Sequence, residues 1–248
     1  MKQTLFALLS ATLFMAACGN QTESSKQNDT TPNEALTLPG DSTVYGLACE
    51  GCTDSILVYI PNVGGDPDTI DILNARVQRR VFGRPDIGDQ VAVVLSADNK
   101  EVADLVINID RLQGEWCYQV MPRLRPRAGV PADSIVQLPP DFPDSLRKKW
   151  FQPREYGFEL NRDRTVRPIG QERRETTHQQ GPVEYPKLKR YRQWYIYNGH
   201  LLLCETRRDT LGNHQIISTD TADIVFMRHD TLQLRFATHE QGYYRRGK

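Results

Sequence analysis

The chain has 248 residues, of which 39% are hydrophobic and 25% are charged, and its 31 basic and 31 acidic residues give a formal net charge of zero. This balance argues against a general binder of nucleic acids or of acidic membrane surfaces. About 230 residues remain once residues 1–17 are set aside, enough for one large or two small domains.

The N-terminal segment has the layout of an export signal. Lys2 supplies a positive charge, and the apolar run Leu5–Ala17 leads to Cys18. A run of this length is too short for a bilayer core, which needs roughly 20 residues. Met15–Cys18 resembles a bacterial lipobox. This resemblance implies that residues 1–17 are a lipoprotein signal peptide and that Cys18 becomes an N-terminus acylated with fatty acids such as palmitate. A plain signal peptide with an incidental cysteine is the alternative.

The segment that begins at Cys18 is expected to link the lipid to the folded part of the chain. Residues 18–41 contain almost no apolar side chain to bury, so we expect a disordered tether. No second apolar run of membrane length follows Cys18, so the membrane contact is expected through lipid alone. The expected location is the bacterial cell envelope at the outer membrane, and the sequence leaves open which face the protein occupies.

Residues 42–110 are predicted to form a small β-barrel of the OB or SH3 type. Short apolar stretches separated by Gly, Asp, Asn and Pro indicate an all-β fold. Ile56–Ile60 is an apolar strand ended by Pro61. Val91–Leu95 is apolar throughout, as expected of a strand covered on both faces. Residues 74–81 fit either a helix or a strand, and the sequence does not settle which.

Residues 111–240 are predicted to form an up-and-down β-barrel, and residues 241–248 a C-terminal tail. Asn198–Gly199 separates two apolar alternations, which is a strong hairpin signal. His229–Asp230 marks another turn, and a meander of such hairpins can close into a barrel. The first strand is expected to begin at Gly114–Trp116.

This second unit resembles the lipocalin-like domain of Bacteroidetes lipoproteins. The matching residues cover about half of the chain and are Leu112–Trp116, Tyr156–Phe158, Trp194, Gly199–Leu203, Gly212–Gln215 and Asp220–Ile224. The resemblance implies a barrel whose first-strand tryptophan closes one end. It implies architecture more than activity, because the ligands of that family are mostly unassigned.

A Pro- and Arg-rich insert, residues 123–151, follows the first predicted strand. By the same resemblance we expect it to fold over the open mouth as a lid. Its predicted helix would turn Leu146, Trp150 and Phe151 towards a pocket. A structural helix packed on the outside of the barrel is the alternative.

Four cysteines remain besides Cys18, and an even number in an exported protein favours disulfides. Four cysteines allow three pairings. The short loop between Cys49 and Cys52 favours that pair, which leaves Cys117 to bond Cys204.

The Cys49-x-x-Cys52 motif also has more specific interpretations than a structural disulfide. A thioredoxin-like pair lies at a helix start after a strand, whereas this pair precedes an apolar strand. A structural zinc site needs four ligands, more than the two cysteines of this motif supply. Haem attachment needs a histidine directly after the second cysteine, where this chain has Thr53. The run Tyr45–Ile56 is similar to the C-x-x-C strand opening of the envelope-stress lipoprotein family NlpE. That similarity makes a copper- or redox-sensing role conceivable.

The sequence predicts a non-enzymatic binding protein without a cofactor, metal or catalytic residue. Its five histidines are scattered, and neither an H-E-x-x-H nor a G-x-S-x-G motif occurs. An eight-stranded barrel can be filled by its own side chains or hold one small ligand. The candidate ligand-binding residues are therefore the aromatics of the predicted strands and lid: Trp116, Tyr118, Trp150, Trp194, Tyr195 and Tyr197.

The predicted ligand is small and apolar or amphipathic. Two alternatives stay open: a module that binds an envelope protein, and a thiol- or copper-sensing lipoprotein that uses Cys49 and Cys52. The aromatic residues can also be plain core. A continuous internal cavity distinguishes ligand binding from the protein-interaction module.

Overall fold

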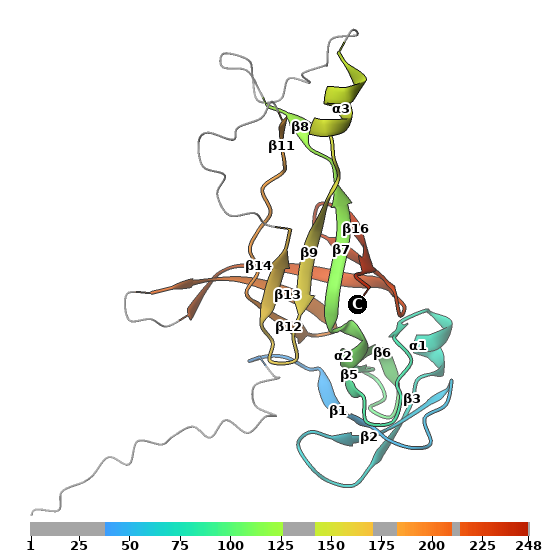
Figure 1. The fold of residues 1–248 in the computed structure, drawn as a ribbon. Coiled ribbons are helices and arrows are strands. Elements are labelled where there is room, and N and C mark those ends of the chain that lie inside the picture. The colour runs from blue at the N-terminus through green and yellow to red at the C-terminus, as the bar shows by residue number, and fades with distance from the viewer. Residues whose placement is uncertain (1–37, 126–141, 171–182, 210–213, 248) are drawn as a thin grey trace, which may run out of the picture.

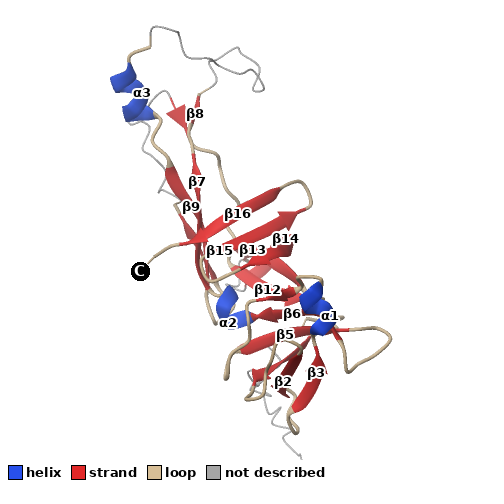
Figure 2. Ribbon diagram, turned by 90° about the vertical axis from the view of Figure 1, so that its right-hand side faces the viewer, coloured by secondary structure: helices blue, strands red, loops and turns tan. Residues whose placement is uncertain are grey.

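The computed structural model describes residues 38–125, 142–170, 183–209 and 214–247. They form mainly β-structure, in two large sheets and one two-stranded sheet (Figures 1 and 2), which confirms the predicted all-β fold. The expected signal peptide, Cys18 and nearly all of the expected tether lie outside the described residues.

The small N-terminal unit contains six strands in the order β3-β2-β1-β5-β6-β4. Its elements are β1 (Val44–Ala48), β2 (Ile56–Pro61), β3 (Asp68–Asp71), α1 (Leu73–Val77), β4 (Val81–Phe82), β5 (Gln90–Leu95) and β6 (Ala103–Asn108). A parallel bridge between Asp71 and Val102 brings the end of β3 to the start of β6. The unit is therefore a partly open barrel, and the helix between β3 and β4 favours the OB type over the SH3 type.

The larger unit is a nearly closed barrel of eight antiparallel strands in the order β10-β9-β7-β16-β15-β14-β13-β12. Its elements are β7 (Gly114–Val120), β9 (Arg154–Leu160), β10 (Val166–Ile169), β12 (Gln193–Tyr197), β13 (His200–Arg208), β14 (His214–Met227), β15 (Thr231–Phe236) and β16 (Glu240–Arg245). An antiparallel bridge between Thr165 and Gln193 joins its two edges. Each strand pairs with its neighbours in the chain, as an up-and-down barrel requires.

The interpretation of residues 241–248 as a tail is wrong. Residues 240–245 form β16, which pairs with β15 and returns to β7, where Tyr244 lies opposite Cys117. The sequence Glu240–Arg245 contains only two apolar-bodied residues, the tyrosines 243 and 244, and Gly242 weakens its strand propensity. Pairing with two neighbours fixes this segment as a strand.

The two units share one hydrophobic core and are not independent bodies. Tyr45, Phe82, Ala92, Leu105 and Ile107 of the small unit belong to the same buried cluster as the barrel's inward-facing residues. A second cluster, which includes the side chains of Val91 and Val93, lies inside the small unit alone.

Strand β5 explains this arrangement. Successive side chains of a strand point to opposite faces, so Val91 and Val93 face the small unit's own core and Ala92 faces the barrel. The predicted double coverage of this apolar strand is confirmed, and the second cover is the closed end of the C-terminal barrel.

Two local structures fix the junction. Helix α2 (Ile109–Leu112) connects the units, and the side chain of Asn108 caps it by accepting a hydrogen bond from the Arg111 backbone N–H. The predicted Asn198–Gly199 turn has positive φ at both residues, 48° and 80°, as this hairpin type needs. A Cβ on Gly199 would lie only 3.0 Å from a Val94 methyl group, so the turn packs directly on the small unit.

The insert after β7 extends away from the barrel body (Figures 1 and 2). Its described parts are β8 (Arg123–Leu124), which pairs with β11 (Val183–Glu184), and α3 (Asp144–Trp150). Helix α3 has no buried residue. Trp150 packs instead on Phe142 of its own loop, with ring centroids 5.3 Å apart.

Candidate ligand-binding site

The closed end of the barrel is filled by two tryptophans. Trp116 and Trp194 are both fully buried. The Trp116 indole N–H donates to the carbonyl oxygen of Leu112 at 2.7 Å, and the Trp194 indole N–H donates to the carbonyl oxygen of Asn161 at 2.9 Å. Both satisfied indoles belong to the core, so their prediction as ligand contacts is wrong.

Arg245 at the end of β16 stabilises this closed end. Its guanidinium carbon lies 4.2 Å from the centroid of the Trp116 ring. The guanidinium also donates to the backbone oxygens of His229, Gln113 and Arg111, at 2.6, 2.7 and 2.5 Å. One side chain therefore ties β16, the β14–β15 turn and helix α2 together. The sequence did not point to it, because it lay in the expected tail.

The opposite end of the barrel opens into a pocket of about 600 Å³, a volume typical of small-molecule sites. Its lining aromatic residues come from five separate parts of the chain and are Tyr118, Phe158, Tyr191, Phe236 and Tyr243. Their rings contact one another: Tyr243 meets Tyr118 edge-on at 5.4 Å and Phe158 at 5.1 Å between centroids. The barrel therefore has a pocket at its mouth, while its closed end is filled by its own side chains.

A polar cluster lies on the wall of this mouth pocket. The Lys189 ammonium donates to both carboxylate oxygens of Asp220, at 2.5 and 2.8 Å, and the Tyr191 hydroxyl donates to one of them at 2.6 Å. Burial would raise the pKa of Asp220, but the hydrogen bonds from Lys189 and Tyr191 outweigh it and lower the pKa. Burial, together with the neighbouring Asp220 carboxylate, raises the pKa of Tyr191. Asp220 is therefore charged and Tyr191 protonated at neutral pH.

Of the six predicted ligand-binding residues, only Tyr118 lines the mouth pocket. Trp150 lies in the extension on α3. Tyr195 and Tyr197 share a face, as predicted, but it is opposite to that of the buried Trp194 and Ile196, so they point away from the barrel core.

The missed residues carry a weak sequence signal. Asp220 is in phase with Ala222 and Ile224, which are buried in the barrel core, so strand alternation alone turns it inward. Lys189 and Tyr191 precede β12, and nothing local indicates that they contact β14.

The predicted lid is wrong for the described residues. Leu146, Trp150 and Phe151 do not line the mouth pocket, whereas Lys187, Leu188 and Lys189 do. The hydrogen bond from the Tyr185 hydroxyl to the Gln152 carbonyl oxygen, at 2.7 Å, holds the base of the extension together. Strands β7 and β9 extend beyond the barrel, and α3, which lies between them in the sequence, is therefore held away from the mouth. The segment before β12 lines the mouth instead.

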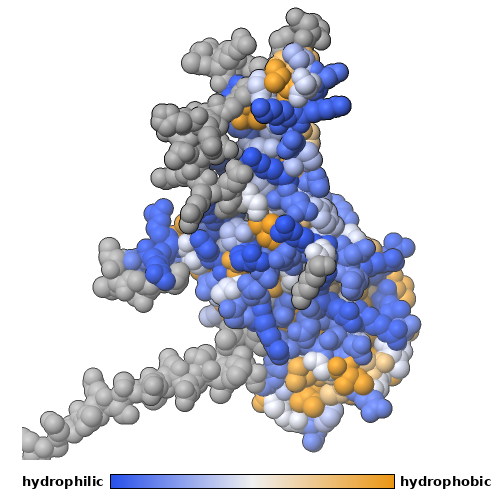
Figure 3. Space-filling model, viewed as in Figure 1, coloured by the Kyte–Doolittle hydropathy of each residue, from blue (hydrophilic) through white to orange (hydrophobic). Residues whose placement is uncertain are grey.

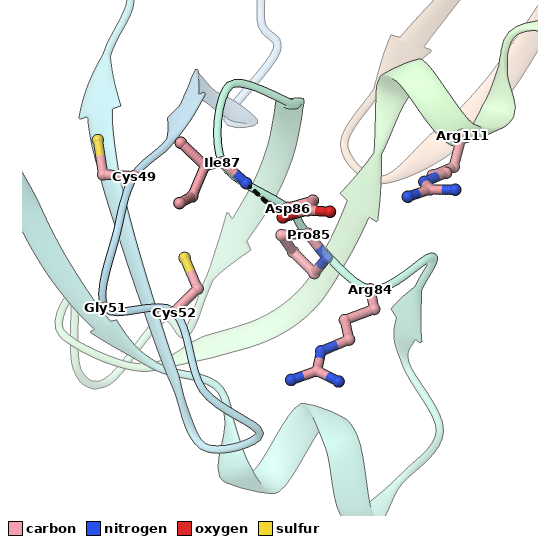
Figure 4. Close-up of a pocket in the computed structure, with 8 residues that line it drawn as sticks. All are labelled: Cys49, Gly51, Cys52, Arg84, Pro85, Asp86, Ile87 and Arg111. Carbon is pink, nitrogen blue, oxygen red and sulfur yellow. Dashed lines mark hydrogen bonds between the residues drawn. The ribbon is translucent and has the colours of Figure 1, made fainter.

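A second, smaller pocket of about 310 Å³ surrounds the C-x-x-C motif. Figure 4 shows Cys49 and Cys52 at the two ends of the loop that contains Gly51, and Pro85 and Ile87 of the loop before β5 line the same pocket. Arg84 and Arg111 supply positive charge at its edge. The Cys49 thiol lies 3.5 Å from the Leu47 carbonyl oxygen and the Cys52 thiol 3.3 Å from that of Val58.

Neither predicted disulfide is present, because all four described cysteines are free thiols. Cys117 lies on β7 and Cys204 on β13, and β16, β15 and β14 separate these strands in the sheet. The Cys204 thiol instead accepts a hydrogen bond from the Thr219 hydroxyl at 3.6 Å. The strand order therefore contradicts the predicted Cys117–Cys204 bond.

The four thiols are expected to differ strongly in reactivity. Burial, reinforced by Glu155, raises the pKa of Cys117 to about 11, and burial also raises the pKa of Cys204. A pKa near 11 leaves roughly a hundredfold less thiolate than in an ordinary thiol. Iodoacetamide at pH 8 should therefore modify Cys49 and Cys52 in the folded protein, and Cys117 and Cys204 only after unfolding. Peptide mass spectrometry checks this order, and equal labelling of all four would contradict it.

Outside the two pockets, the described residues show fewer features of a binding site. In the part of the chain that the structure describes, no three His, Cys, Asp or Glu side chains cluster as a metal site would require. None of the described helices has the length and apolar character needed to cross a membrane. Figure 3 shows apolar residues gathered at the lower end, where β2 lies in Figure 1. On β1 and β2, Leu47 lies opposite Ile60, and each is 40% exposed.

Comparison of the chain with protein-family models, with curated proteins and with solved structures found no match.

Proposed function

We propose that this protein is a non-enzymatic binding protein that holds a small amphipathic ligand in the mouth pocket of its C-terminal barrel. We propose also that Cys18 carries a lipid that anchors it in the bacterial cell envelope. The single observation that supports the binding role is a cavity of about 600 Å³ with five aromatic side chains and one polar cluster on its wall. The lipocalin-like resemblance of the sequence is consistent with such a role.

The lining suggests how a ligand would be oriented. Binding sites for small molecules are mostly apolar and fix orientation with a few polar groups. Here the rings of Tyr118, Phe158 and Tyr243 line the pocket, and Lys189, Tyr191 and Asp220 supply the polar groups. A ligand with a flat apolar body and one polar end fits both features.

A neutral fluorescent probe tests this role. N-Phenyl-1-naphthylamine should bind the protein carrying Cys18→Ser, which has no acylation site, and its emission should rise in the pocket. Phe236→Asp should weaken binding about tenfold or more, because an apolar wall is lost and a charge is added. The matched control is Phe226→Asp, since Phe226 lies on neighbouring β14, is 38% exposed and does not line the mouth pocket. Equal binding by both variants would place the probe elsewhere.

A protein-interaction module is the second candidate function. The observation in its favour is the exposed apolar side chains Leu47, Ile56 and Ile60 on β1 and β2. If no apolar probe enters the mouth pocket, this candidate takes first place.

A further inference from the structure

Asp220 is an unusual side chain for the wall of an aromatic pocket. Among the described residues it is the one carboxylate that lines the mouth pocket, together with five aromatic rings. Its side chain is only 25% exposed. The Tyr191 hydroxyl holds one of its oxygens at 2.6 Å, so the carboxylate is fixed in place without any ligand.

The partner of this carboxylate is a flexible cation from the same chain. Lys189 lies between β11 and β12, in a segment without helix or strand. Its side chain is 52% exposed, and its ammonium contacts both oxygens of Asp220. A lysine ammonium at this position shows that the carboxylate accepts an ammonium group at the edge of the pocket.

We propose that the mouth pocket binds an organic cation, a primary amine on an aromatic or flat apolar body, and that Lys189 is a tethered competitor for the same place. The inference rests on the proposed ligand-binding function and names the class of ligand. The ligand ammonium displaces that of Lys189, pairs with Asp220 and leaves its apolar body among the rings. Lys189 then moves into solvent, where a long charged side chain is well hydrated.

Two physical arguments favour a cation over an anion. The faces of aromatic rings carry negative potential and attract ammonium groups. A ligand carboxylate would also approach the fixed negative charge of Asp220, and like charges at close range repel. Lys187 and His239 line the pocket as well, and they favour an anion, so the test includes one.

The test uses three ligands of similar size on the Cys18→Ser protein: 2-phenylethylamine, 2-phenylethanol and phenylacetate. Each competes with N-phenyl-1-naphthylamine, and calorimetry confirms the affinities. The amine should bind best of the three. Lys189→Met should strengthen amine binding about five- to tenfold, because the self-occupied state is removed. Asp220→Asn should abolish the preference for the amine over the alcohol.

Lys187→Met is the matched comparison, because Lys187 lines the same pocket and has the same charge. It should raise amine affinity by less than Lys189→Met does, since the ion pair with Asp220 is formed by Lys189. Circular dichroism of each variant checks that the fold is retained.

The outcomes separate the two proposals. If phenylacetate binds best and Lys189→Met weakens it, the cation proposal is overturned and the ligand-binding role stands. The same holds if the neutral probe binds but Lys189→Met and Lys187→Met affect the amine equally. If the neutral probe itself does not bind, the ligand-binding role fails.

Discussion

A chain that begins at Gln113 is expected not to fold into a soluble monomer, although it contains every strand of the larger barrel. It lacks the small-unit side chains that cover the closed end of that barrel: Tyr45, Phe82, Ala92, Leu105 and Ile107. Burying each of the four larger ones contributes roughly 1.5–3 kcal/mol, about 6–12 kcal/mol together. A whole domain is stable by only about 5–15 kcal/mol. Size-exclusion chromatography and near-UV circular dichroism of the fragment measure this result.

The same junction can be tested in the full chain. Ile107 is fully buried in the shared core, whereas Ile60 of the same unit is 40% exposed. Ile107→Asp should lower the free energy of unfolding by more than about 4 kcal/mol, and Ile60→Asp by less than about 1 kcal/mol. A fragment from Gln113 that unfolds cooperatively like the full chain would show instead that the units are independent domains.

Replacing Arg245 is the second substitution with a large expected effect. Arg245→Met leaves three backbone carbonyl oxygens without their donor and removes the contact of the guanidinium with Trp116. Hydrogen bonds from a charged group contribute about 1.5–3 kcal/mol each and do not add fully. We therefore expect a loss of about 3–5 kcal/mol in the free energy of unfolding. In a protein of this size each kcal/mol shifts Tm by about 2–4 °C.

The neighbouring arginine provides the control. Arg246 is 48% exposed on its side chain and forms surface ion pairs, 3.2 Å to Glu155 and 3.8 Å to Glu115. Exposed pairs of this kind contribute about 0–1 kcal/mol, so Arg246→Met should leave Tm nearly unchanged. Thermal unfolding followed by circular dichroism compares the two variants. If Arg246→Met is as destabilising as Arg245→Met, the closed end does not depend on the Arg245 guanidinium.

Residue patterns in the sequence predicted only part of the candidate site. Alternation placed Tyr118 on a barrel strand, and it does line the mouth pocket. The same pattern could not separate Trp116 from Tyr118, because both lie on one face of β7 and only depth along the barrel distinguishes them. Lys189 and Asp220 are 31 residues apart in sequence, and their contact exists only because the segment before β12 crosses β14.

The sequence by itself determined what depends on neighbours along the chain. The all-β character, the Asn198–Gly199 turn and the doubly covered β5 all follow from side-chain alternation and turn chemistry, which act over a few residues. Only the tertiary structure decided that residues 240–245 are a strand, that Cys117 and Cys204 stay apart, and that one core joins both units. Each of these depends on which distant strands pair, and strand pairing is set by burial summed over the whole sheet and not by the local residues.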